Sequence, residues 1–388
     1  MLNHLFDWLQ SLGIHIPGAG LFHFLSFRAM LAAVISMLIA YFAGGRIINL
    51  LRRKQIGEDI RDLGLEGQMQ KKGTPTMGGL IIIAALLGSA LLVCRLDSIY
   101  TLLLVVTTLW CGAIGFTDDY IKVFKHNKEG MSPRGKLILQ FGLGLFVAVT
   151  VCLSPAIPTD KLVTTIPFVK AHEFDYSWLS PFHGQLGVYC SWGIYMVMII
   201  LVTLACSNGT NLTDGMDGLA AGTSAIVGVA LGIIAWLGGD ALDAKYLNIM
   251  YIPGSGEVAI YMAAFVGALI GFLWYNTFPA QVFMGDTGSL TIGGVIGVSA
   301  VLIRKELLLP ILCGIFLMES LSVIIQRGYF KYTKKKYGKG RRVFLMAPLT
   351  TITRNRASPS RASSRASGSS GSSWQSAHWH YSRLDSKI

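Results

Sequence analysis

The fold of this chain is decided by stretches such as residues 258–304, which read VAIYMAAFVGALIGFLWYN, TFPAQVFMGDT and GSLTIGGVIGVSAVLIR in succession. Two apolar segments, 258–276 and 288–304, flank a short polar connection. A transmembrane helix needs about 20 mostly apolar residues, because it rises about 1.5 Å per residue and the hydrocarbon core is about 30 Å thick. The pattern therefore predicts two membrane-spanning helices joined by a loop that contains one acid, Asp286.

The composition of the whole chain indicates an integral membrane protein. Hydrophobic residues make up 52% of its 388 residues and charged residues only 14%, and the mean hydropathy is +0.54. Soluble proteins of this length do not normally carry that balance. The six cysteines show no metal or redox spacing and are typical of small buried side chains. The net charge of +12 partly reflects basic cytoplasmic loops, and no nucleic-acid partner is expected.

Apolar windows of spanning length predict an all-α, polytopic transmembrane bundle with nine spans in this chain. The predicted spans are 24–46, 76–94, 99–117, 135–153, 187–206, 217–237, 258–276, 288–304 and 307–327.

The distribution of Lys and Arg orients these spans. Seven lie between Arg46 and Lys72, five between Lys122 and Lys136, and eight between Arg327 and Arg342, whereas the alternate loops carry few. The positive-inside rule then places the amino terminus outside and the connections 47–75, 118–134, 207–216 and 277–287, with everything after 328, in the cytoplasm. The outer stretch 154–186 contains β-branched residues around Val163-Thr-Thr-Ile166 and is expected to form a small hairpin.

Four acidic positions interrupt the apolar sequence. A carboxylate costs roughly 2.5–3.5 kcal/mol at the centre of a membrane helix, so acids at or near membrane depth are functional candidates. The positions are Asp118-Asp119, the run Asn211-x-x-Asp214-x-x-Asp217, Asp286 and Glu319. The first three lie near glycines, where oxygen ligands for a hard divalent cation can converge.

Each acidic motif has a structural alternative. Adjacent residues cannot share a helical face, so Asp118 and Asp119 are expected to have different partners; a solvated helix end would look the same. The spacing of Asn211, Asp214 and Asp217 places them on one side of a helical turn, and a capping cluster is the alternative.

Three further motifs extend the candidate site. Phe283-Met-Gly-Asp286 combines a ring that could stack on a base with a carboxylate for a metal, although a capped turn explains it equally well. Lys71 and Thr76 lie in a basic, glycine-rich stretch that suits phosphate contacts. Alternatively, its lysines only set the orientation of the neighbouring span in the membrane. No Walker pattern supports ATP hydrolysis. Glu319 and Gln326 share one face of the last predicted span. They could face the bundle interior or a groove for a lipid headgroup, or they could form helix-packing hydrogen bonds.

Five motifs in order resemble the polyprenyl-phosphate N-acetylhexosamine-1-phosphate transferases, over about residues 20–349. They are Thr74-Pro-Thr-Met-Gly-Gly79, Gly115-Phe-Thr-Asp-Asp-Tyr120, Asn211-Leu-Thr-Asp-Gly-Met-Asp-Gly-Leu219, Phe283-Met-Gly-Asp-Thr-Gly-Ser289 and Phe344-Leu-Met-Ala-Pro348. The first and last are similar specifically to the phospho-N-acetylmuramoyl-pentapeptide-transferases, the bacterial enzymes that make lipid I.

This resemblance implies a family fold of ten spans with a Mg²⁺-dependent active site on the cytoplasmic face of the bacterial inner membrane. The implied reaction transfers phospho-N-acetylmuramoyl-pentapeptide from UDP-N-acetylmuramoyl-pentapeptide to undecaprenyl phosphate and releases UMP, the first membrane step of peptidoglycan synthesis. It also leaves room for a homodimer.

The resemblance also implies roles for individual residues. Asp118 is expected to deprotonate the lipid phosphate, with Asp119 beside it. Asp286 is expected to be the Mg²⁺ ligand or, in some proposals for the family, the nucleophile. The residues expected to line the substrate site are Lys71, Thr76, Lys136, Asn211, Asp214, Asp217, Asn276, Phe283 and Gln326.

The carboxyl-terminal segment departs from the family. There, Met-Ala-Pro-Leu is followed by His-His-His-Tyr and a tenth span, whereas this chain continues with Thr350-Thr-Ile-Thr353. Codons for His-His-His-Tyr read one base late encode Thr-Thr-Ile-Thr, which predicts a one-base frameshift near codon 350. Residues 1–349 are therefore expected to form the membrane transferase domain, and 350–388 a disordered tail rich in Ser and Arg.

Two other functions compete with the transferase. A secondary transporter would also place acids at membrane depth, but it would carry them in mid-span and show inverted repeats. No repeat is visible here, and the main clusters lie at predicted span ends. A catalytically impaired or non-catalytic family member would follow if the tail as written replaces the His cluster and the last helix.

Overall fold

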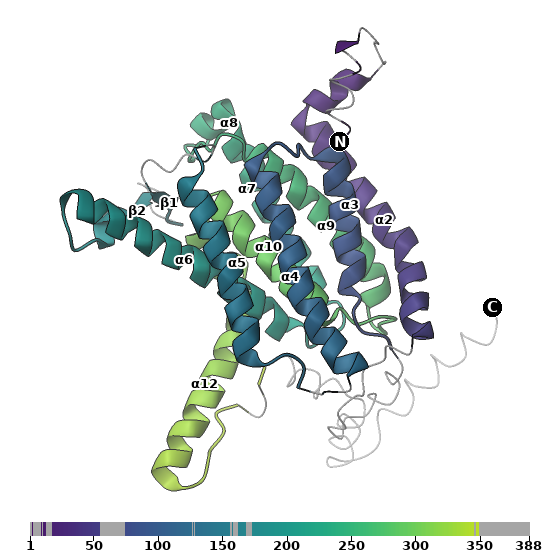
Figure 1. The fold of residues 1–388 in the computed structure, drawn as a ribbon, viewed down its shortest axis with the longest axis vertical. Coiled ribbons are helices and arrows are strands. Elements are labelled where there is room, and N and C mark those ends of the chain that lie inside the picture. Colours follow the sequence, from purple (N-terminus) through teal and green to yellow (C-terminus); the bar gives the residue numbers. More distant parts are fainter. Residues whose placement is uncertain are drawn as a thin grey trace, which may run out of the picture.

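The computed structural model describes residues 2, 9, 11–12, 18–54, 74–125, 127, 129–155, 157, 162–167, 173–344 and 347–348, and these form an α-helical bundle (Figure 1). Lys71 and the segment predicted to be a disordered tail lie outside these residues. The elements in chain order are η1 (Ala19–His23), α2 (Leu25–Arg53), α3 (Gly79–Val93), α4 (Ile99–Phe124), α5 (Pro133–Leu153), β1 (Val163–Thr165), β2 (Glu173–Asp175), η3 (Tyr176–Leu179), α6 (Gly184–Thr213), α7 (Leu219–Gly239), α8 (Ala241–Tyr246), α9 (Gly256–Asn276), α10 (Gly285–Leu302), η4 (Glu306–Leu308), α11 (Leu309–Leu312) and α12 (Gly314–Tyr337).

The predicted bundle of spans is confirmed, with two differences. Within the described residues, α2, α4, α5, α6, α7, α9 and α10 are long and apolar enough to cross a membrane. The second predicted span is α3, which has only 15 residues. The ninth is not one straight helix, because the chain bends by 82° between η4–α11 and α12. As a result, α12 points away from the rest of the bundle (Figure 1).

Helix α10 is the centre of the bundle. Every residue from Thr287 to Leu302 is buried, and Figure 1 shows α10 behind α4 and α5. Its sequence consists mainly of Gly, Ser, Thr, Ala and Val. Small side chains let neighbouring helices approach closely, which is how membrane helices gain packing energy without a hydrophobic driving force. A helix enclosed in this way holds its first residues at a defined place among its neighbours.

The ends of α4 and α6 lie further along the chain than predicted. Residues 118–124 were expected to belong to a loop, but α4 continues to Phe124. Likewise α6 continues to Thr213, so Asn211 lies in its last turn. The expectation that Asn211, Asp214 and Asp217 share one side of a helical turn was wrong, because the helix ends at Thr213 and a glycine-containing turn precedes α7.

The connections predicted to be cytoplasmic meet at one end of the bundle. The backbone N–H of Phe283 donates to the carbonyl of Pro75 at 2.9 Å, and the N–H of Asp286 donates to Asp119 at 3.1 Å. These residues come from three different connections. The arrangement brings motifs that are more than 200 residues apart in sequence to one end of the bundle.

The predicted hairpin is confirmed at the opposite end. Strand β1 pairs antiparallel with β2, with Val163 opposite Asp175. The hairpin is attached to the far end of α10, where the carbonyl of Arg304 accepts from the N–H and the hydroxyl of neighbouring β1 residues, Thr165 and Thr164. Lys305 also donates to Thr165 Oγ1. The hairpin is thereby fixed to the central helix.

A buried ion pair connects three helices near the same end of the bundle as the hairpin. The guanidinium of Arg28 on α2 contacts both carboxylate oxygens of Glu257 on α9, at 2.7 and 2.8 Å. It also donates to the carbonyl of Val93, the last residue of α3. Both charges are therefore paired and hydrogen-bonded, as burial requires.

Candidate active site

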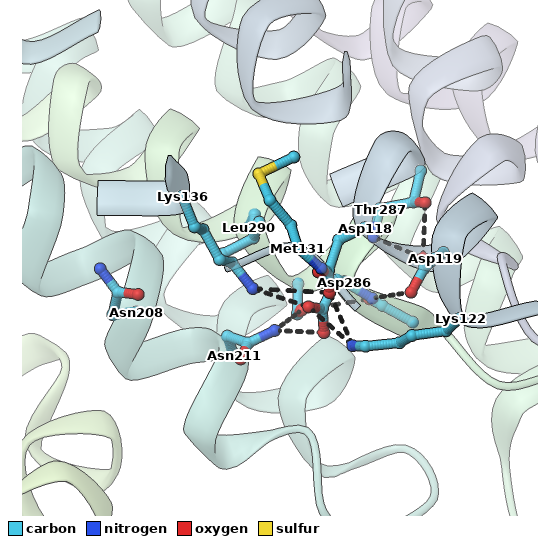
Figure 2. Close-up of polar contacts among 12 residues, drawn as sticks. Asp118, Asp119, Lys122, Met131, Lys136, Asn208, Asn211, Asp286, Thr287 and Leu290 are labelled. Carbon is cyan, nitrogen blue, oxygen red and sulfur yellow. Dashed lines mark hydrogen bonds and ion pairs between the residues drawn. The ribbon is translucent and has the colours of Figure 1, made fainter. Parts of the chain in front are cut away.

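Three carboxylates converge where α4 ends and α10 begins. Asp118 and Asp119 lie in the last two turns of α4 and Asp286 in the first turn of α10 (Figure 2). One oxygen from each lies within 4.8 Å of the other two. The close approach depends on Gly115, since a Cβ atom there would lie 2.3 Å from the carbonyl oxygen of Asp286. The predicted meeting of Asp118 and Asp286 is confirmed, whereas Asp214, which was predicted to join them, is not part of this group of three. The cluster could hold a metal ion.

Asp119 anchors the start of α10. Its carboxylate accepts from the backbone N–H groups of Asp286 and Thr287, at 3.1 and 2.9 Å, and from the hydroxyl of Thr287 at 2.6 Å. The first amides of a helix lack partners within the helix and form its positive end, so a carboxylate is favoured there. Asp119 therefore positions Asp286 rather than pointing into free space.

Asp118 faces the other way. Its Oδ1 accepts from the N–H of Met131 at 2.6 Å, and its Oδ2 lies 2.6 Å from the ammonium of Lys122, one turn later on α4. The adjacent acids thus have different partners, as predicted. The alternative of a solvated helix end is wrong, because Asp118 and Asp119 are each only 3% exposed.

Asp286 is contacted on both oxygens. Its Oδ2 accepts from Lys136 at 2.6 Å and from Lys122 at 3.1 Å. Its Oδ1 accepts from the side-chain amide of Asn211 at 2.7 Å, which also donates to Ser289. Three carboxylates and two ammonium groups leave one net negative charge. Such a site can bind a cation, and its lysines can contact phosphate oxygens.

A second group of predicted residues builds the neighbouring loop, 277–284. The side chain of Asn276 accepts from the N–H of Gly218 and donates to the carbonyl of Val282, both at 3.0 Å. Asp217 accepts from the N–H of Ala280 at 3.4 Å. The capping alternative for the Asn-Asp-Asp run is not seen at α7, because its N-cap position is Gly218, which has no side chain to act as a cap.

The Thr-Pro-Thr motif lies against the same loop. The carbonyl of Phe283 accepts from the N–H of Gly78 at 2.8 Å, and the N–H of Gly79 donates to Met284. Thr76 is buried and Phe283 is half-buried. The start of α3 is therefore joined to the start of α10.

Gln326 lies on α12 and makes its contacts with a later segment. Its Oε1 accepts from the N–H groups of Val343 and Phe344, and its Nε2 donates to the carbonyl of Phe344. Glu319, two turns earlier, is buried. The oxygen and the nitrogen of the Gln326 side chain thus hold residues 343–344 against α12; these residues are not helical, so the bonds differ from the helix-packing bonds of the structural alternative.

Several site residues were missed from the sequence. Lys122 contacts two of the three acids, and its i,i+4 spacing from Asp118 was visible. It was missed because the predicted span ends at residue 117, whereas α4 continues to Phe124. Thr287 and Ser289 were quoted in a motif without a role, and the backbone of Met131 carries no side-chain signal.

Comparison with known proteins agrees with this geometry. Residues 101–304 match the family described as glycosyl transferase family 4, and residues 71–83 match signature 1 of the phospho-N-acetylmuramoyl-pentapeptide-transferases. The chain thus belongs to a family of glycosyl transferases, and its apolar helices make it a membrane protein.

Curated relatives define the family more narrowly. The phospho-N-acetylmuramoyl-pentapeptide-transferase of Parabacteroides distasonis is 54% identical over 90% of this chain and 88% of its own length. Those of Flavobacterium johnsoniae and Porphyromonas gingivalis are 51% and 52% identical, over 90% of this chain and 91% and 88% of their own lengths. The chain belongs to the phospho-N-acetylmuramoyl-pentapeptide-transferase family, and the transporter alternative is set aside.

Proposed function

We propose that this protein transfers phospho-N-acetylmuramoyl-pentapeptide from its UDP carrier to undecaprenyl phosphate, giving lipid I and UMP. The observation that carries the proposal is the meeting of Asp118, Asp286, Lys122, Lys136 and Asn211 at one end of the bundle. Membership of a family whose named members carry out this transfer supports it.

The reaction needs charge neutralisation and alignment more than covalent chemistry. An oxygen of the lipid phosphate attacks the β-phosphorus of the UDP carrier, the bond to the bridging oxygen breaks, and UMP leaves. Negative charge grows on the phosphoryl oxygens in the transition state, where lysine ammonium groups stabilise it. Lys122 and Lys136 lie on either side of Asp286 and are proposed to contact these oxygens. Asp118 is proposed to accept the remaining proton of the lipid phosphate.

The donor set also fits a magnesium ion, because carboxylate oxygens are the ligands that Mg²⁺ prefers. Asp286 is the residue that would hold it, and one oxygen each of Asp118 and Asp119 lies close enough to contribute. Magnesium, when bound, would supply positive charge to the diphosphate oxygens.

The remaining predicted residues are proposed to bind the nucleotide and the diphosphate. They are Lys71, Thr76, Asp214, Asp217, Asn276 and Phe283. Of these, Thr76, Asp217, Asn276 and Phe283 lie in or against the loop 277–284, beside the carboxylates, and combine a hydroxyl, a carboxylate, an amide and a ring.

The site is proposed to lie at the cytoplasmic face of the bacterial inner membrane. The connections at this end of the bundle carry most of the Lys and Arg residues, and the positive-inside rule assigns such connections to the cytoplasm. An undecaprenyl phosphate in the inner leaflet would present its anionic head at this depth.

The tail is proposed to be a frameshift product. The relatives match 90% of the chain, which is about as many residues as precede Thr350. Resequencing codon 350 in the source DNA tests this directly, and an intact reading frame there would refute it.

The transfer is tested by measuring UMP release from the full chain, reconstituted with undecaprenyl phosphate, UDP-N-acetylmuramoyl-pentapeptide and Mg²⁺. We expect release that stops on chelation and returns with Mg²⁺, and that is lost in Asp286→Asn but kept in Asp240→Asn, an exposed cap at the other end of the bundle. A frame-restored chain is assayed in parallel. No UMP from either form, or unchanged release in Asp286→Asn, refutes the proposal. Release only from the restored form shows that the tail as written impairs activity.

A further inference from the structure

A second polar layer lies one helical turn deeper in the bundle than the carboxylate site. Gln140 on α5 follows Lys136 by four residues, and Ser207 and Asn208 on α6 precede Asn211 by four and three. The Nε2 of Gln140 donates to Ser207 Oγ at 3.2 Å, and the Nδ2 of Asn208 donates to Gln140 Oε1 at 2.9 Å.

This layer also includes α10. Ser207 Oγ donates to the carbonyl of Leu290 at 3.3 Å, and Leu290 follows Asp286 by one turn. The contact is made possible by Gly293, where a Cβ atom would lie 2.3 Å from the carbonyl oxygen of Cys206. Helices α5, α6 and α10, which place Lys136, Asn211 and Asp286, are thus joined again one turn deeper in the bundle.

Gln140 is the centre of this layer and is 1% exposed. A buried amide in a membrane bundle must find partners for both its N–H groups and its oxygen. Its partners here both come from α6, so the helix pair is held in one register. A slip of α5 along α6 would break these bonds and move Lys136 by the same distance.

We propose that Gln140 is a positioning residue for the transfer reaction. By fixing α5 against α6, it places the Lys136 ammonium on one oxygen of Asp286 while Asn211 holds the other. The expected effect on kcat rests on the proposed function, whereas the expected effect on the position of Lys136 does not.

The structural consequence is tested by lysine labelling, which requires no turnover. The full chain in detergent is reductively methylated, and the rates at Lys136 and Lys122 are compared by mass spectrometry. Both amines contact Asp286 Oδ2, but Lys122 lies on α4. We expect Gln140→Leu to raise the rate at Lys136 several-fold and to leave Lys122 unchanged. Equal rises at both lysines, or no change at either, overturn the proposal.

The kinetic consequence is tested by a double-mutant cycle. We expect Gln140→Leu to lower kcat by about tenfold or more, since small displacements at a reacting centre are costly, with little change in KM for the UDP substrate. In a Lys136→Met background, Gln140→Leu should lower kcat almost no further, because the effect of Gln140 on the reaction passes through Lys136. An undiminished further loss in that background would show a general structural role.

Two variants control for folding. Ser207→Ala removes part of the same layer and should change Lys136 labelling in the same direction if Gln140→Leu is too unstable to purify. Tyr261→Phe removes another buried side-chain contact, to Thr108 between α4 and α9, and should leave both labelling and kcat unchanged. If wild-type protein releases no UMP, the proposed function fails, whereas the labelling ratio still decides this inference.

Discussion

The contact between α4 and α10 gives the sharpest prediction, for Gly115→Ala. A Cβ atom at residue 115 would lie 2.3 Å from the carbonyl oxygen of Asp286 and 2.5 Å from Thr287 Cα, whereas ordinary contacts begin at 3.4 Å. Backbone atoms cannot turn aside as a side chain can, so α10 must move by about 1.1 Å. Overpacking of this kind costs about 1–3 kcal/mol of the free energy of unfolding. A displacement of about 1 Å at a reacting centre costs about 100-fold in rate.

The assay is UMP release per folded molecule, with thermal unfolding in detergent measured in parallel. Gly112→Ala is the matched control, one turn earlier on the same helix. There, the new Cβ meets the mobile methyl end of Ile83 at 2.7 Å, so both stability and most of the activity should remain. Full activity in Gly115→Ala would refute the argument that this close approach places Asp286. An equal loss of activity in both variants would refute it as well.

Three further outcomes are expected from other contacts. Asn211→Asp places a carboxylate where an amide donates to Asp286 at 2.7 Å, so UMP release should fall further than in Asn211→Ala, and similar losses in the two would contradict this. Arg28→Met leaves Glu257 buried without its partner and should lower the free energy of unfolding by about 3–5 kcal/mol, with no change in the rate per folded molecule; an unaltered melting temperature would argue against it. Burial lowers the pKa of Lys305 from 10.5 to about 8. Because the unfolded chain then binds the extra proton between these values, the stability of the wild type relative to Lys305→Met should rise from pH 8 to 10.5, and a flat difference would contradict this.

The membrane architecture was largely predictable from the sequence. An apolar run of spanning length satisfies its backbone hydrogen bonds in a membrane by forming a helix. Each predicted window therefore coincides with a helix or, for the last window, with a bent helix pair. The β-branched residues after 162 predicted the hairpin. The meeting of Asp118 and Asp286 followed from topology, because both lie at ends of spans assigned to one side. The same argument predicted Asp214 in the cluster, but the residue of that run that contacts Asp286 is Asn211.

The helix ends were not predictable from hydropathy. Polar residues at the end of α4 look like the start of a loop, but their side chains bind within the protein and the helix continues. Lys122 was missed for this reason. The contacts of Gln326 were hidden for another reason, because its partners lie 17 and 18 residues later. Sequence spacing on one helix carries no information about a chain that folds back on it.

Because other helices enclose α10, its composition differs from that of a helix that faces lipid. Within the described part of the chain, α10 is less hydropathic than the other helices of spanning length, because it packs against other helices along almost its whole length. The span that carries Asp286 is thus the one that a hydropathy scan scores most poorly. A leucine in place of one of its glycines would improve the score and wedge the bundle apart.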